Sequence, residues 1–152
     1  MESSNHRILI VDDNVANREL LEAYLVNVDC ETEVAEDGQE AVDKALTFKP
    51  DLILLDVIMP KLSGFEVCQK LKSDPATRNI MILMVTALNE LGDIERAIEA
   101  GTNDFLSKPV NRVELIKRVE NMLQLKGVSD ENERLRQYIQ QLEDDNAPTA
   151  KS

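Results

Sequence analysis

Short apolar runs alternate with amphipathic segments along most of the chain. Uninterrupted apolar residues occupy 8–11, 52–55 and 80–85, and two further strand-like segments lie at 31–35 and 104–106. Continuous apolar runs of this length are typical of parallel strands that are covered on both faces. Residues 31–35 alternate polar and apolar side chains instead, so we expect this strand to lie near an edge of its sheet.

Each predicted strand is followed by a segment whose apolar residues recur at the spacing of a helix. These segments cover about 20–28, 38–46, 65–72, 90–100 and 112–123. Asp37 is suited to cap the second helix, Gly101 closes the fourth, and the fifth begins after Asn111. Five strand–helix units predict an α/β fold, a doubly wound five-stranded parallel sheet with right-handed crossovers. Ligands of such sheets bind beyond the carboxyl ends of the strands.

Length and charge narrow the class of protein. The 152 residues suit one compact domain with an appendage. The 29 acidic and 17 basic residues give a net charge of −12, which argues against nucleic acid or anionic membranes as partners. The polar start lacks a signal-peptide pattern, and no apolar run approaches the roughly 20 residues of a membrane helix. Cys30 and Cys68 have neither metal-ligand nor disulfide spacing, so we expect reduced thiols and a cytoplasmic protein.

Polar residues stand at the carboxyl ends of four of the predicted strands. Asp12 and Asp13 follow the first strand, Asp56 the third, Thr86 the fourth and Lys108 the fifth. Each alone has an ordinary explanation, such as helix capping or exposure to water, but the predicted fold brings all five to one pocket. Carboxylates about 4 Å apart repel by about 4 kcal/mol per pair at an effective dielectric of 20. Such a cluster raises its pKa values, spreads apart or binds a cation, and its hard oxygen ligands suit Mg²⁺.

A metal beside a carboxylate also indicates chemistry. An aspartate can attack a phosphoryl group and form an acyl phosphate. Because the transition state spreads its charge, catalysis is mainly positioning and neutralisation. We expect Mg²⁺ to neutralise one side and Lys108 the other, while the Thr86 hydroxyl donates to a phosphoryl oxygen.

Four sequence blocks resemble the signature blocks of two-component response-regulator receiver (CheY-like) domains. The blocks are Ile-Leu-Ile-Val-Asp12-Asp13-Asn, Leu-Leu-Asp56-Val-Ile-Met-Pro60-Lys-Leu-Ser-Gly64, Val-Thr86-Ala87 and Phe-Leu-Ser-Lys108-Pro109. The resemblance covers about residues 7–125 and extends to receivers at the N-terminus of diguanylate cyclase-type regulators. It implies a (βα)5 flavodoxin-like receiver fold, followed here by a C-terminal helical extension.

The resemblance also implies roles for single residues. Asp56 is implied as the phosphoacceptor, and Asp12, Asp13, Asp56 and the backbone carbonyl of Ile58 as the Mg²⁺ ligands. Lys108 is implied to contact the phosphoryl group. A sensor histidine kinase or phosphotransfer protein is the implied donor, and a downstream protein or a missing output domain the implied target. The chain would then be a signalling switch that catalyses only its own phosphorylation and dephosphorylation.

Two further residues are implied to carry the switch. Thr86 is its hydroxyl, and Phe105 matches the aromatic switch position, although Phe105 also suits an ordinary core residue. Phosphorylation would change the surface formed by the fourth helix, fifth strand and fifth helix. The family also implies a cis bond between Lys108 and Pro109, which the sequence itself only permits.

The chain departs from fast-resetting relatives at two positions. Two residues after the acceptor and two after the threonine, such relatives commonly hold polar side chains, and here these are Ile58 and Leu88. Because apolar side chains cannot orient an attacking water, we expect a comparatively long-lived phosphoryl state. The alternative is that both side chains merely pack under a loop.

Three other functions fit the sequence less well. A pseudo-receiver that only binds proteins would not need the five polar residues at the strand ends. A phosphatase of the haloacid-dehalogenase kind requires a second aspartate where Ile58 stands, together with a cap domain. A flavodoxin-like cofactor binder requires a phosphate-cradling loop after the first strand, where Asp12 and Asp13 would repel phosphate.

The last 28 residues carry a heptad pattern. Apolar residues and one asparagine are spaced 3, 4, 3, 4, 3 at Leu125, Val128, Asn132, Leu135, Ile139 and Leu142. We predict a receiver domain over 1–126, a helical or coiled-coil tail over 127–145 that forms a homodimer, and a disordered end over 146–152. An amphipathic helix packed on its own domain is the alternative. The sequence fits both a single-domain regulator and a fragment of a longer one.

Overall fold

Five parallel strands form one sheet in the order β2-β1-β3-β4-β5. The computed structural model describes residues 6–88 and 90–146, and the side chains of 126–134, 137 and 144–146 lie outside that description. The strands are β1 (His6–Val11), β2 (Cys30–Ala35), β3 (Leu52–Leu55), β4 (Met81–Thr86) and β5 (Asp104–Ser107). The predicted α/β fold class is confirmed, and β2 lies at an edge as its alternating pattern indicated.

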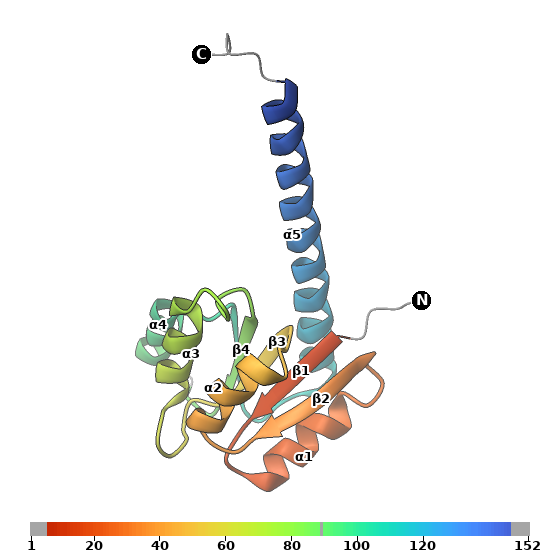
Figure 1. Cartoon of the computed structure of the whole chain (residues 1–152). Coiled ribbons are helices and arrows are strands. Elements are labelled where there is room, and N and C mark those ends of the chain that lie inside the picture. Colours follow the sequence, from red (N-terminus) through yellow and green to blue (C-terminus); the bar gives the residue numbers. More distant parts are fainter. Residues whose placement is uncertain (1–5, 89, 147–152) are drawn as a thin grey trace.

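Helices cover both faces of the sheet (Figure 1). They are α1 (Val15–Tyr24), α2 (Gly38–Thr47), α3 (Gly64–Ser73), α4 (Leu91–Ala100) and α5 (Arg112–Asn146). Buried residues of α2, α3 and α4 share one apolar cluster with the sheet, whereas those of α1 and α5 share the other. The layers are therefore helix, sheet and helix, which is the doubly wound arrangement.

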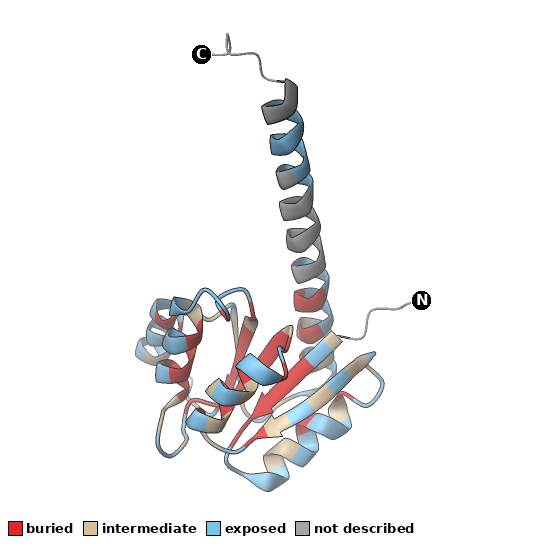
Figure 2. Cartoon of the chain, in the orientation of Figure 1, coloured by how far each residue is buried: buried red, intermediate tan, exposed pale blue. Residues whose placement is uncertain are grey.

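The central strands contribute to both apolar clusters. Along β1, Leu9 and Val11 face α2 and α3, while Ile8 and Ile10 face α1 and α5. All four side chains are at most 1% exposed, and Figure 2 shows the central strands as the most deeply buried part of the sheet. This two-sided burial explains the uninterrupted apolar runs, because a strand covered on both faces has no polar side.

Local signals fix where several helices begin and end. The Asp37 carboxylate accepts a hydrogen bond from the backbone N–H of Glu40 at 2.8 Å, as expected of an N-cap. The Asn111 side chain accepts one from the N–H of Glu114 at 3.0 Å, and α5 begins at the next residue. Gly101 ends α4 with a φ of +100°, a conformation that side chains with a Cβ rarely adopt.

The last helix continues well beyond the sheet. It is helical from Arg112 to Asn146, so Gly127 neither ends nor interrupts it, and it projects away from the domain (Figure 1). The boundary predicted near residue 126 therefore coincides with no break in the helix, and it stays a prediction. The predicted disordered end falls mainly on 147–152, outside the described residues. Among the described helices, none combines the length and hydropathy needed to cross a bilayer.

The buried strands set the stability of the domain. Leu54, in β3, is 1% exposed, and its truncation to alanine leaves a cavity in the cluster under α1 and α5. We expect Leu54→Ala to lower the free energy of unfolding by about 2–5 kcal/mol. Urea unfolding followed by circular dichroism measures this. The control is Val26→Ala, at a side chain 75% exposed, with an expected change within about 0.5 kcal/mol. Equal effects would contradict the two-sided packing.

Candidate functional site

Four strands deliver polar side chains to the carboxyl edge of the sheet. Asp12 and Asp13 follow β1, Asp56 follows β3, Thr86 ends β4, and Lys108 follows β5. The structure thus brings together the five residues predicted to meet there. Asp12, Asp56 and Thr86 are 2%, 6% and 0% exposed, whereas Asp13 is exposed. Burial matters because a carboxylate removed from water needs partners.

Lys108 contacts both buried carboxylates. Its Nζ donates to Asp12 Oδ2 at 2.8 Å and to Asp56 Oδ2 at 3.3 Å. Its backbone N–H donates to the carbonyl of Thr86 at 2.8 Å, which ties the segment after β5 to the end of β4. The Lys108–Pro109 peptide bond is cis, as the resemblance implied.

The second oxygen of each buried carboxylate accepts a hydrogen bond from the backbone. Asp12 Oδ1 accepts from the N–H of Asn14 at 2.9 Å, and Asp56 Oδ1 accepts from the N–H of Ile58 at 3.3 Å. Each carboxylate is therefore fixed on one side by a backbone amide and drawn on the other toward Lys108. The orientation of both groups is set before any ligand binds.

Burial and charge act in opposite directions on Asp56 and Lys108. Burial raises the pKa of Asp56, the charge of Lys108 lowers it, and the charge of Asp12 raises it again, so that the net shift is upward. For Lys108, burial lowers the pKa, but the hydrogen bond to Asp12 and the charges of both carboxylates raise it by more. Lys108 therefore stays an ammonium, while Asp56 is easier to protonate than an ordinary aspartate.

The acidic side chains form a group that fits a hard cation. Carboxylate oxygens of Asp12, Asp13 and Asp56 all lie within 4.8 Å of one another. Three carboxylates face one ammonium, so negative charge is in excess, and the donor set consists of oxygens alone. Mg²⁺ takes few carboxylates and keeps several waters, which the exposure of Asp13 allows.

Thr86 links the acidic edge to an apolar cluster. Its hydroxyl oxygen accepts a hydrogen bond from the N–H of Leu88 at 3.4 Å. The side chain of Leu88 is partly buried against the cluster beneath α2, α3 and α4, and so are those of Met59 and Phe105. Phe105 is half-buried, so the structure places it both as a packing residue and next to the surface.

Two residues that shape the site, Gly64 and Arg18, had no predicted role. A Cβ added to Gly64 would overlap the backbone carbonyl of Asp56, so α3 can approach the strand end only with glycine there. The sequence signal that could have indicated this role is the place of Gly64 directly after Ser63, the N-cap of α3. The Arg18 side chain donates to the carbonyl oxygen of Asp12 at 2.8 Å, and no spacing or motif indicated that contact.

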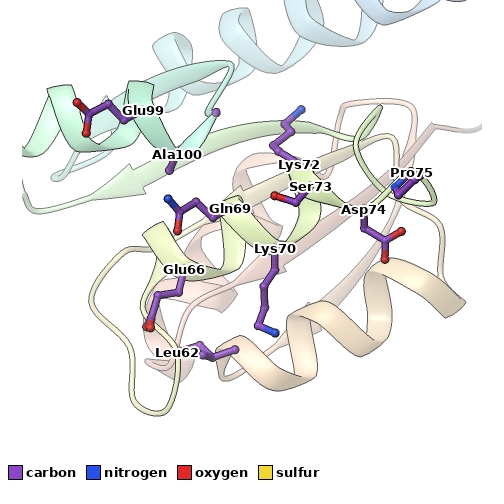
Figure 3. A pocket seen from close by; sticks show the side chains of 11 residues that line it. Leu62, Glu66, Gln69, Lys70, Lys72, Ser73, Asp74, Pro75, Glu99 and Ala100 are labelled. Atoms are coloured by element: carbon purple, nitrogen blue, oxygen red, sulfur yellow. The ribbon is translucent and has the colours of Figure 1, made fainter.

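A groove of about 920 Å³ lies away from the acidic cluster, between α3 and α4. Figure 3 shows that Glu66, Lys70 and Glu99 project in different directions from it and do not converge on one point. The ammonium of Lys72 donates to the backbone carbonyls of Arg78 and Ile80. The groove therefore lacks the focused polar groups that characterise a ligand site.

Comparison with known sequences agrees with the geometry. A sequence model of the response regulator receiver domain matches residues 8–120. The response regulator PleD of Caulobacter vibrioides is 48% identical over 125 residues, which cover 82% of this chain and 28% of that protein. A transcriptional regulator of Synechocystis, RpaA, is 38% identical over 77% of this chain and 48% of its own length. The chain spans about a quarter to a half of these curated relatives.

Solved structures of response regulators and receiver domains also superpose on this chain. A putative response regulator from Chloroflexus aurantiacus superposes with a TM-score of 0.76 at 36% identity, covering 80% of this chain and 99% of its own. The receiver domain of a sensor histidine kinase from Pseudomonas aeruginosa, described with a magnesium ion coordinated in its active site cleft, gives 0.73 at 31% identity, with 80% and 99% covered. With the family model covering most of the chain, these matches show that the chain belongs to the response regulator receiver domain family.

Proposed function

We propose that Asp56 accepts a phosphoryl group in a Mg²⁺-dependent reaction and that the chain thereby works as a signalling switch. The observation that supports this most directly is the pair of hydrogen bonds from Lys108 to the buried Asp12 and Asp56. Because the Lys108 ammonium lies between these two carboxylates, it can contact a phosphoryl group that is transferred to Asp56. The receiver of the Pseudomonas kinase, with magnesium in its active site cleft, supports the choice of metal.

The proposed reaction is an in-line displacement on phosphorus. One carboxylate oxygen of Asp56 attacks the phosphorus of a phosphohistidine, forming a P–O bond as the P–N bond breaks. The leaving imidazole nitrogen keeps the electron pair. Lys108 neutralises the charge that spreads over the phosphoryl oxygens, and the Thr86 hydroxyl donates to one of them. Mg²⁺, held by Asp12, Asp13, Asp56 and the carbonyl of Ile58, would neutralise the opposite side.

The switch would run from Thr86 to the surface of α4, β5 and α5. When the Thr86 hydroxyl turns toward a phosphoryl oxygen, its 3.4 Å contact with the N–H of Leu88 must change. Leu88 and Phe105 pack against the same apolar cluster, so Phe105 can occupy space that this movement opens. Coupling of about 1–3 kcal/mol is typical of such linkage and is sufficient to bias a partner's binding.

Exposed apolar side chains on that surface support a protein target. Leu91 and Ile98 of α4 are 71% and 66% exposed, and Val113 of α5 is 69% exposed. We propose that this surface binds a downstream protein or an output domain. The presence of RpaA, named as DNA-binding, and PleD among longer relatives supports a variable output.

The phosphodonor would approach beside Lys108. A hollow of about 270 Å³ lies between α1 and the segment after β5, lined by Leu20, Tyr24, Lys108 and Pro109 among others. Its apolar lining suits a helix of a sensor histidine kinase or phosphotransfer protein.

Cys30 and Cys68 are free thiols, which supports the cytoplasm as the compartment.

Acceptor identity can be tested by intact mass. The full chain is incubated with Mg²⁺ and a small-molecule phosphodonor, beside Asp56→Asn and a reaction without metal. We expect one phosphoryl adduct on the wild type and none in either control, because the nucleophile or the neutralising cation is then missing. If wild type binds Mg²⁺ and is folded yet gains no adduct, the phosphoacceptor proposal fails and a pure binding module is favoured.

Mg²⁺ affinity should weaken as the pH falls. The pKa of Asp56 is raised above its ordinary value of 3.8, and only the ionised carboxylate binds metal well. Binding is thus strongest well above the raised pKa and is lost as the pH falls through it. Calorimetric Mg²⁺ titrations from about pH 8 down to about pH 4 measure this. Asp56→Asn is expected to bind more weakly with a flatter profile, and an unchanged profile would contradict the assignment.

The phosphoryl group is expected to be long-lived. The side chain of Ile58 is 55% exposed beside the acceptor, and that of Leu88 is partly buried, so neither can orient water for attack. We expect Ile58→Asn with Leu88→Glu to shorten the lifetime about tenfold or more, measured as loss of the adduct over time. Leu91→Glu, the same change at an exposed position, is the control. Unchanged decay in the double variant would show that both residues only pack.

A further inference from the structure

The projecting part of α5 has an apolar side that the described domain does not cover. Among the side chains that the structure describes, the buried residues of the helix lie at its base and end at Leu123. Beyond them, Leu125, Leu135, Ile139 and Leu142 are 60%, 53%, 53% and 42% exposed. Figure 2 shows the buried base of the helix, and the described turns near its far end are coloured as exposed. The tail is therefore not packed on its own domain at these positions.

We propose that this side binds the same side of a second copy of the chain, forming a parallel two-stranded coiled coil. The exposed leucines and Ile139 fall on the a and d positions of a heptad repeat that starts at Leu125 and includes Val128 and Asn132. An a/d repeat fits a second helix with the same repeat, because each side chain inserts between four residues of its partner. The association does not rest on the phosphorylation chemistry.

The repeat begins where the helix leaves the domain. One heptad earlier, the a and d positions are held by Arg118 and Asn121. Arg118 already donates to both carboxylate oxygens of Asp104 on β5, each at 2.8 Å, so it is engaged within the chain. The intrachain contacts of α5 thus lie at its base, and the heptad repeat begins beyond them.

The two sides of the helix also point in different directions. At 3.6 residues per turn, Leu135, Ile139 and Leu142 lie about half a turn around the axis from the residues that face the sheet, Leu115 and Val119. A partner helix on the exposed side would meet the projecting turns of α5 and not the apolar core of the receiver.

Polar residues favour two parallel strands. Asparagine at an a position is a common means of specifying a two-stranded register, and Asn132 holds such a position. Glu131 falls at g and Arg136 at the following e, which pair attractively between parallel helices. The b, c and f positions from 126 to 144 are polar, charged or glycine. The projecting helix thus has one apolar side, as a dimer requires.

The length of the projection also favours a partner. Residues 124–146 extend beyond Leu123, the last buried residue among the described side chains, and Gly127 lies within this segment. In proteins most of the stability of a helix comes from packing of its apolar side, and a glycine within the helix lowers its intrinsic stability. Pairing of the apolar sides supplies the stabilisation that neither the domain nor intrinsic propensity provides.

Sedimentation equilibrium of the full chain tests the association. We expect a species of twice the 17.1 kDa chain mass as concentration rises to about 1 mM. Ile139→Glu places a charge in the seam and is expected to weaken dimerisation at least about tenfold. Gln141→Glu adds the same charge at an outer c position two residues away and is expected to leave it unchanged. Circular dichroism and Mg²⁺ binding report whether each receiver is still folded.

Cysteine crosslinking tests the parallel arrangement. In a parallel dimer the two copies of position 142 face each other at a d position, so Leu142→Cys should form an interchain disulfide under mild oxidation. Gln141→Cys, on the outer side, should not. Both are made in a Cys30→Ser, Cys68→Ser background whose fold is checked first, and read on non-reducing gels.

The possible outcomes are distinct. A dimer lost in Ile139→Glu, kept in Gln141→Glu and linked through position 142 supports the proposal. A chain that is monomeric throughout the concentration range overturns it. A dimer insensitive to Ile139→Glu would use another surface, and one not linked through position 142 would not be parallel. Higher oligomers would overturn the two-stranded assignment. None of these readings depends on an adduct at Asp56.

Discussion

The site depends on a single ammonium group shared by two buried carboxylates. Asp12 and Asp56 come from adjacent central strands, and Lys108 reaches both from the segment after β5. If Lys108 were absent, two nearly buried negative charges would face each other, offset by backbone amides and, at Asp56, by the Thr86 hydroxyl. The position of that segment, and with it the start of α5, is therefore tied to the charge balance at the end of β1 and β3.

The two faces of the sheet contribute unequally to function. Under α1 and α5 the cluster holds buried aliphatic side chains, and several of its partly buried members lie in or just before β2, among them Val28, Cys30 and Val34. Under α2, α3 and α4 the cluster ends in partly buried residues near the acidic edge, among them Met59, Leu88 and Phe105. Incompletely covered side chains can change position at lower cost than fully packed ones. The second face is thus where a change at the strand ends can be transmitted.

Much of the fold could be predicted because its signals are local. The apolar runs of β1, β3 and β4 indicated two-sided burial, the alternation of β2 indicated an edge, and Asp37 and Gly101 marked helix ends. The meeting of the strand-end residues followed from the shared edge of parallel strands. These signals need no knowledge of distant contacts.

What could not be predicted depends on contacts between segments far apart in sequence. The sharing of Lys108 by two carboxylates joins residues 96 and 52 positions apart. The requirement for glycine at position 64 exists only because α3 approaches the carbonyl of Asp56. The continuity of α5 from Arg112 to Asn146 was also not predicted, because a glycine such as Gly127 is unfavourable inside a helix when only local propensity is considered.

The length of α5 would turn a small change in its angle into a large displacement of its far end. From Leu125 to Asn146 the helix extends about 33 Å at 1.5 Å per residue. The contact of Arg118 with both carboxylate oxygens of Asp104 lies at the base of α5, and Asp104 directly precedes Phe105. Movement of Phe105 could therefore change the angle at which α5 leaves the domain. A tilt of α5 by only about 5° at its base would move the far end of the helix by about 3 Å. A rearrangement too small to alter the core would thus become a displacement as large as a hydrogen bond is long.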